Sequence, residues 1–271
     1  MRRTGLAAQA PSAGLGSSEL GPSWLGLACL LAFGVGCGGA SPLMHPAHVL
    51  SEGKVSVGAG AAGQITALER AQPVRDDKSG PVLEEYAVSP GLSPWASGRV
   101  GITGDNEAGI TYAGRAFRVD FRHAFQLDPV YLSLGLGGSG VVPRPKGGGD
   151  DLGSAYGGGG DVPILIGWKS TAELYSVWAG ARGGFEILSG NALESEVIQG
   201  GREDVFMPFS GNHYFVGGLV GTKLGFRNLH VALEVDVLYH FGNGTFGQNQ
   251  EKEASVEQLT ISPGSALILT F

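Results

Sequence analysis

The sequence predicts an all-β protein: an antiparallel up-and-down transmembrane β-barrel of about ten strands, with eight or twelve as alternatives, after an N-terminal signal segment. Three observations favour this fold. Glycine accounts for 48 of 271 residues, more than twice its ordinary share of about 7%. Charged residues make up only 16%, against roughly 25% in soluble domains. Apolar and polar residues alternate in long runs, and no run of about 18 apolar residues follows the N-terminal region.

Residues 1–36 are typical of an export signal with a long N-terminal region. Residues 24–36 form a 13-residue apolar core, which is the length found in signal peptides and too short to span a membrane. Small residues and Cys37 follow, and this arrangement resembles the lipobox of bacterial lipoproteins. The resemblance implies that Cys37 is lipidated; cleavage after Ala40 by ordinary signal peptidase is the alternative.

The rest of the chain divides into two parts in this interpretation. We expect residues 37–53 to form an extended tether and residues 54–271 to form the barrel. The tether would reach on the order of 50 Å at about 3.3 Å per residue, enough to join a lipid in the inner leaflet to the lower rim of the barrel.

The clearest strand covers residues 229–241. Its odd positions are all apolar, from Leu229 to Phe241, and its even positions include His230, Glu234 and Asp236. This period of two over 13 residues indicates a strand with one apolar face, longer than the usual 5–6 residues or so. Residues 117–125 repeat the pattern with phenylalanine and valine on one face and charges on the other.

The same reasoning gives ten strands in order. They cover residues 54–64, 94–103, 107–114, 117–126, 130–141, 162–170, 174–186, 213–226, 229–241 and 258–271. The connections after the second, fourth, sixth and eighth strands are short, and those after the first, fifth, seventh and ninth are each about 16 residues or more. Short turns at one end and long loops at the other are typical of outer-membrane barrels.

Charged residues within these strands keep to the face opposite the apolar one, which predicts a charged lumen. The predicted lumen residues are Lys54, Arg99, Arg118, Asp120, Arg122, Lys169, Arg182, Lys223, Glu234 and Asp236. Buried charges need partners, so a lumen closed by ion pairs is favoured over a narrow anion-selective channel. Aromatic residues near the strand ends are predicted to form girdles at the membrane interfaces: Trp95, Trp168, Tyr175, Trp178, Tyr214, Phe226, Tyr239 and Phe241.

The C-terminus ends in an alternating strand whose Leu267, Leu269 and Phe271 share one face. Together with the strand pattern, a terminal phenylalanine resembles the assembly signal of Gram-negative outer-membrane β-barrels. The resemblance covers about residues 54–271. It implies contact with outer-membrane lipids, recognition of the last strand by the barrel-assembly machinery, and both termini on the periplasmic side. The oligomeric state is left open.

Gly58, Gly60 and Gly63 have the spacing of a dinucleotide-binding turn, but the residues around them do not support that function. Lys54 and Ser56 alternate with valines, whereas a nucleotide-binding first strand reads as a continuous apolar run inside a βαβ unit. We expect the glycines to allow close packing of a strand, and we expect no nucleotide, cofactor or metal. The net charge of −7 argues against a nucleic-acid partner.

No residues have the spacing of a catalytic or metal site, and His230 and His240 are about 33 Å apart along one strand, which favours rim positions. The first hypothesis is therefore a non-enzymatic outer-membrane barrel for envelope structure, surface interaction or limited solute passage. The alternative is a lipid-anchored soluble barrel that binds an apolar ligand as lipocalins do, with the apolar faces inside. An outer-membrane enzyme is the third.

Overall fold

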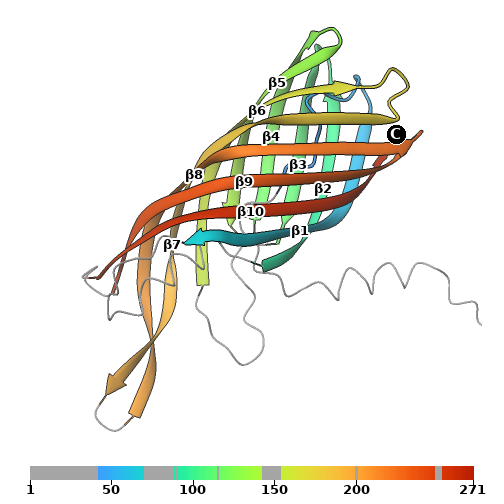
Figure 1. Cartoon of the computed structure of the whole chain (residues 1–271). Helices are drawn as coiled ribbons and strands as arrows, with labels where there is room; N and C mark the ends of the chain where they lie inside the picture. Colours follow the sequence, from blue (N-terminus) through green and yellow to red (C-terminus); the bar gives the residue numbers. More distant parts are fainter. Residues whose placement is uncertain are drawn as a thin grey trace, which may run out of the picture. The chain divides into compact units, whose positions relative to one another are not determined.

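The computed structural model describes residues 42–69, 88, 91–114, 116–141, 154–198, 201–247 and 252–271. It contains ten strands: β1 (Val55–Glu69), β2 (Gly91–Ile102), β3 (Asn106–Ala113), β4 (Ala116–Leu127), β5 (Val130–Val141), β6 (Ser154–Lys169), β7 (Tyr175–Ile198), β8 (Gly201–Phe226), β9 (Leu229–Phe246) and β10 (Lys252–Thr270). Each strand pairs antiparallel with its sequence neighbours, and β1 pairs with β10. The sheet is thus a closed barrel (Figure 1), and the predicted fold and strand number are confirmed. No helix among the described residues is long and apolar enough to cross a membrane.

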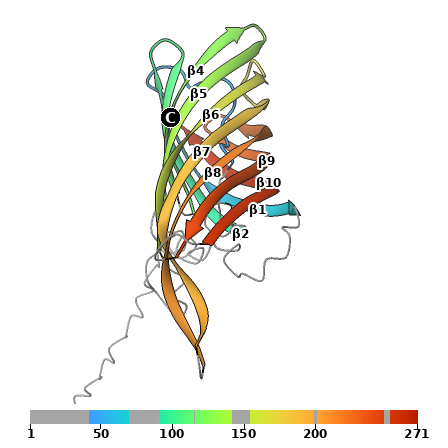
Figure 2. The ribbon, with the colours of Figure 1, turned by 90° about the vertical axis from the view of Figure 1, so that its left-hand side faces the viewer.

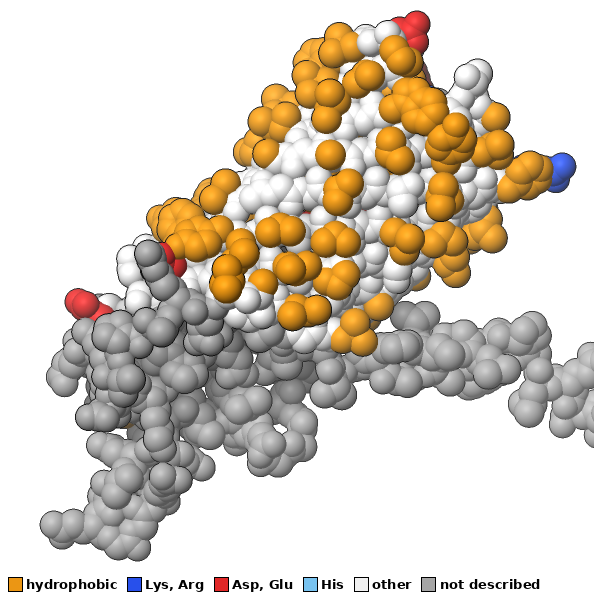
Figure 3. Space-filling view, viewed as in Figure 1, with side chains coloured by type: hydrophobic (Ala, Val, Ile, Leu, Met, Phe, Trp, Pro, Cys, Tyr) orange, Lys and Arg blue, Asp and Glu red, His pale blue; other side chains and the backbone are white. Residues whose placement is uncertain are grey.

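The alternation in the sequence sets the two faces of the barrel wall. Along β9 every second residue is buried from His230 to His240, and the residues between them, from Leu229 to Phe241, are exposed. Figure 3 shows hydrophobic side chains spread over the outside of the barrel. The polar faces therefore point inward and the apolar faces outward, the reverse of a soluble protein.

The four predicted short turns lie together at one end of the barrel, which we call the short-turn end. Residues 103–105, 128–129, 170–174 and 227–228 connect β2 to β3, β4 to β5, β6 to β7 and β8 to β9. The C-terminus lies at this end too, where Phe271 exchanges backbone hydrogen bonds with Val55 at the start of β1. The short-turn half of the sequence prediction is confirmed.

At the opposite end, several strands run further than the sequence indicated. We expected a long loop after the seventh strand, but β7 and β8 form a hairpin there. Strand β7 ends at Ile198, and β8 begins at Gly201. Beyond Asn191 and Pro208, these strands pair only with each other. We call residues 192–207 the ribbon; Figure 2 shows this hairpin projecting past the other strands.

The outer apolar band has the height of a membrane. The 13 residues of β9 from Leu229 to Phe241 extend about 40 Å along the strand and about 28 Å along the axis at a tilt of about 45°. Trp168 packs on Tyr175 near the short-turn end, and Tyr214 stacks on Phe241 near the other. Trp95 and Trp178 do not belong to either girdle, because both are 2% exposed and lie inside the barrel.

Candidate functional site

The lumen is occupied by residues 42–50, which we call the plug. Residues 42–48 are all buried, and Leu43, Met44 and Ala47 belong to the hydrophobic cluster at the centre of the molecule. This differs from the extended tether expected over residues 37–53, because the part from residue 42 onward lies within the barrel. Cys37, the predicted lipidation site, lies outside the described residues.

Glu234 of β9 holds the deep part of the plug. Its Oε1 accepts hydrogen bonds from the backbone N–H groups of Leu43 and Met44, and its Oε2 accepts one from Trp178 Nε1 at 2.7 Å. Trp95 of β2 adds a bond from Nε1 to the carbonyl of Pro42 at 3.2 Å. Both tryptophans thus use their single N–H donor to fix the plug or the side chain that binds it.

Arg122 of β4 holds the middle of the plug with all of its donors. Its Nη1 donates to Pro46 O and to His45 Nδ1, the latter at 2.9 Å. Its Nη2 donates to His48 O at 3.2 Å and to Glu107 Oε1 at 2.8 Å, and Nε donates to the same Oε1. The guanidinium has five N–H donors, so all five are used.

Glu107 of β3 binds the plug at the short-turn end. Its Oε2 accepts the backbone N–H of Leu50 at 2.8 Å, and its Oε1 also accepts Arg99 Nε. Most of these bonds reach plug backbone atoms rather than plug side chains. The wall therefore holds an extended segment at successive depths.

A network of ion pairs, which we call the belt, crosses the inside of the wall from β2 to β9. Arg99 pairs with Asp120 at 2.8 Å, Asp120 with Arg118 at 2.7 Å, and Arg118 with Asp161 at 2.8 Å. Its members are Arg99, Arg118, Arg122, Arg182, Glu107, Asp120, Asp161 and Asp236. Each arginine has a carboxylate within 4 Å, so the four cations and four anions are mutually neutralised.

Seven of the predicted lumen charges lie buried inside the barrel: Arg99, Arg118, Asp120, Arg122, Arg182, Glu234 and Asp236. Lys169 pairs with Glu173 of the β6–β7 turn at 2.8 Å, and this bond lowers the pKa of the Glu173 carboxyl. Lys223 faces inward near the short-turn end and is half-buried. Lys54 departs from the prediction, because it precedes β1 and is exposed.

Sequence reasoning missed several residues that the structure places in the lumen. Asp161 was assigned to a loop, but β6 begins at Ser154, and Asp161 lies on the inward face with Pro163 and Leu165. Glu107 lies at the start of β3. An error of one residue in the predicted strand boundary is enough to leave open which side of the wall this residue faces. Both residues would have been found by continuing the alternation of inward and outward residues beyond the apolar band.

His240 is fully buried inside the barrel, and its predicted rim position is wrong. It stacks on His213 with ring centroids 5.1 Å apart, and His213 Nε2 and His240 Nδ1 are 2.9 Å apart. Glu186 and Thr260 extend the chain at 3.1 Å and 2.8 Å. Both rings and Thr260 are 0% exposed, so no substrate reaches Thr260 in this structure. Among the described residues, no group of three histidine, cysteine, aspartate or glutamate side chains is placed to hold a metal.

Inward-facing glycines make room for the large lumen side chains. A Cβ at Gly221 would overlap the Trp178 ring, and one at Gly58 would lie against the ring of Trp95. Gly58 belongs to the glycine motif of β1, whose predicted role was close packing. The high glycine content thus has a local cause on the inner face.

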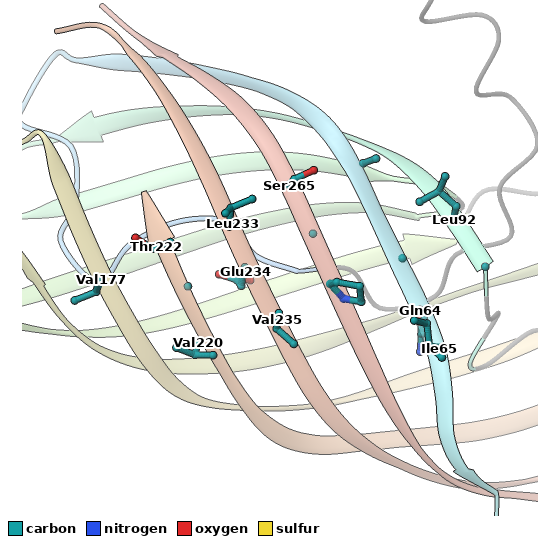
Figure 4. A pocket seen from close by; sticks show the side chains of 16 residues that line it. Gln64, Ile65, Leu92, Val177, Val220, Thr222, Leu233, Glu234, Val235 and Ser265 are labelled. Atoms are coloured by element: carbon teal, nitrogen blue, oxygen red, sulfur yellow. The ribbon is translucent and has the colours of Figure 1, made fainter. Parts of the chain in front are cut away.

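A groove of about 920 Å³ lies in the outer wall, where β8, β9, β10 and β1 carry small residues (Figure 4). Val220, Leu233 and Ile65 border it and are strongly exposed. Ala61, Gly63 and Gly264 are among the small residues that line it. The lining is mostly apolar, and at its inner side it reaches Gln64 and Glu234, the carboxylate that binds the plug.

No protein-family model matches the chain, and no curated protein is similar to it. Among solved structures, Neisserial surface protein A matches with a TM-score of 0.32 and 11% identity over 80% of this chain and 96% of that one. The attachment invasion locus protein Ail of Yersinia pestis matches with a TM-score of 0.29 and 11% identity over 81% and 100%. Matches with TM-scores this low say nothing about the function of this chain.

Proposed function

We propose that this chain is an integral outer-membrane β-barrel without enzymatic activity, whose lumen is closed by its own plug and belt. The observation that carries the proposal is the reversed polarity: an apolar outer band about 28 Å high surrounds a lumen in which charged residues are buried and paired. Such a barrel serves envelope structure or surface interaction. The ribbon beyond the barrel is the part best placed for a surface contact.

The proposal includes the topology and partners implied by the sequence. The short-turn end, with the C-terminus, faces the periplasm, and outer-membrane lipids contact the apolar band. Leu267, Leu269 and Phe271, which are 57%, 41% and 60% exposed, present the last strand to the assembly machinery. Lipidation of Cys37 remains part of the hypothesis.

Limited solute passage is the second candidate, and one observation favours it. The plug is a single segment held by side chains of β2, β3, β4 and β9, not a strand of the sheet, so it can leave without breaking the ladder. A soluble cup for an apolar ligand is not supported, because the inner faces are polar and charged.

The test compares unboiled with boiled protein on an SDS gel and then measures conductance in planar bilayers. We expect a mobility shift on boiling and no stable conductance. Deleting residues 42–50 should keep the shift and raise the conductance. Identical mobility with and without boiling, in a protein that stays soluble without detergent, would overturn the membrane-barrel proposal. A stable wild-type conductance as high as that of the deletion would favour the open channel.

A further inference from the structure

A small cavity lies between the plug and the wall near the short-turn end. Its volume is about 30 Å³, and its lining includes His45 of the plug, Arg99, Arg122 and Lys223 of the wall, and the hydroxyl groups of Ser56 and Ser97. A cavity of this volume has room for a water molecule or a small ion.

Two buried donors at this cavity have no hydrogen-bond partner among the described residues: Arg99 Nη1 and His45 Nε2. Arg99 is 7% exposed and His45 is 3% exposed. Arg122 donates to His45 Nδ1, so the neutral ring carries its proton on Nε2 and offers a donor there. A buried donor without a partner destabilises the folded state, which favours an acceptor in the cavity.

The charge around the cavity is balanced except at Lys223. Arg99, Arg122, Lys223 and Glu107 line it, and the two arginines are paired with Glu107 and with Asp120 beside the lining. Both Glu107 oxygens are already engaged by Arg99, Arg122 and the Leu50 backbone. In the part of the chain that the structure describes, Lys223 forms no ion pair within 4 Å. An anion would therefore be better stabilised here than a neutral water molecule.

We propose that the cavity binds one small inorganic anion of halide size, and that this anion locks the plug against the wall. The anion accepts from His45 of the plug and from Arg99 of the wall, and it balances the Lys223 ammonium. It thus joins the movable segment to the fixed strands. The inference rests on the proposed closed barrel and adds a ligand to it.

The test measures the temperature at which unboiled protein loses its compact gel mobility, in sodium chloride and in sodium gluconate at equal ionic strength. Gluconate is too large for the cavity. We expect the midpoint to rise with chloride, by about 3–6 °C at ten times the Kd, and to continue rising with the logarithm of the concentration. Lys223→Met should abolish this dependence. Lys169→Met, which removes a lysine paired with Glu173 outside the cavity, should keep it.

A second measurement does not depend on any variant. Wild-type crystals grown in bromide should show an anomalous peak between His45 and Arg99. Equal midpoints in both salts, an unchanged chloride dependence in Lys223→Met, or no bromide peak would each overturn the anion site. A barrel that still shifts on boiling and does not conduct in either salt would leave the proposed function standing, so the two failures are distinguishable.

Discussion

Arg122 connects the plug to the wall through more bonds than any other side chain described here. One guanidinium binds Pro46 O, His48 O, His45 Nδ1 and Glu107 Oε1. The bonds diverge from a planar fork, and a lysine ammonium has only three donors on a flexible stem. A positive charge alone therefore does not explain why position 122 is an arginine.

Replacing Arg122 by lysine should loosen the plug while the barrel stays closed. The readout is maleimide labelling of Ala47→Cys, a plug position that is 0% exposed, in a chain that begins at residue 38 and has no other cysteine. We expect at least a tenfold faster labelling in Arg122→Lys, since about 1.4 kcal/mol corresponds to a factor of ten. Arg122→Ala should have a larger effect, about 3–5 kcal/mol, because it leaves Glu107 without this partner. Arg227→Lys in the exposed β8–β9 turn is the control, and equal rates in all variants would contradict the assignment.

The burial of His45 beside the charge of Arg122 makes the plug sensitive to acid. His45 lies outside the ten strands, and burial together with the Arg122 guanidinium holds its pKa well below the ordinary value. The released plug therefore binds more protons than the docked plug, and acidification favours release. Docking is fully stable above the ordinary histidine pKa of about 6.5 and weakens as the pH falls below it.

The labelling rate of Ala47→Cys is divided by the rate of the same maleimide with a free thiol at each pH, because the thiolate is the reactive form. This ratio should be constant above about pH 7 and increase toward pH 5. His45→Asn supplies a side-chain oxygen that accepts from Arg122 without titrating in this range. Its ratio should rise less steeply toward pH 5, with the remaining rise due to His48, whose pKa is also lowered by burial. The same acid response in His45→Asn would assign the effect to another group, His48 being the nearest candidate in the plug.

Sequence patterns predicted which charges enter the lumen better than they predicted which partners those charges have. Alternation placed Arg118, Asp120 and Arg122 on one inward face, and the structure buries all three. It could not place Pro42–Leu50, because a segment held through its backbone carries no periodic signal. Trp95 binds the carbonyl of Pro42. The alternation of β2 does not indicate this partner, so the sequence pattern places Trp95 in a girdle instead.

At the scale of strands, the two ends of the barrel differ in how far the sequence determines them. At the short-turn end, the predicted and observed limits agree within about two residues; β5 has the predicted limits, Val130–Val141. At the other end, β8 begins 12 residues earlier than predicted, at Gly201 rather than 213. Apolar alternation stops where the membrane band stops, but backbone pairing continues without it. A pattern based on burial therefore marks the band and not the strand.

The ribbon should be dispensable for the barrel. Residues 192–207 pair only within the β7–β8 hairpin, so their removal breaks no bond to β6 or β9. Joining Asn191 to Pro208 through a two-residue Asn-Gly turn should keep the mobility shift on boiling and move its midpoint by less than about 4 °C, the effect of about 1 kcal/mol. Removing residues 213–216 of β8, which pair with both neighbours, is the control and should abolish the shift. Loss of the shift in the ribbon deletion would mean that the ribbon contributes to folding.

For the whole molecule, closure depends on a single seam between the first and last strands. β1 and β10 are paired from Ser56 with Thr270 to Glu69 with Gln258, with one register shift between Thr66 and Leu68. Every other pair in the barrel joins strands adjacent in the sequence. Pairing across the seam therefore closes the longest loop in the chain, and it forms only when the first and last strands are both in place. The plug lies just before β1 in the sequence. The same part of the chain therefore closes the seam and fills the lumen.

A disulfide across the seam tests closure and register together. Ala59 and Leu267 are register partners, and partners in an antiparallel pair have Cα atoms about 4.5–5.5 Å apart, within disulfide range. In the chain that begins at residue 38, Ala59→Cys with Leu267→Cys should therefore oxidise to an intramolecular bond, seen as altered mobility of boiled, non-reduced protein. Ala59→Cys with Phe271→Cys is the matched control: four residues further along β10 is about 13 Å, so that pair should stay reduced. Oxidation of the control pair alone would show a seam shifted by four residues, and oxidation of neither pair would show an open sheet in place of a barrel.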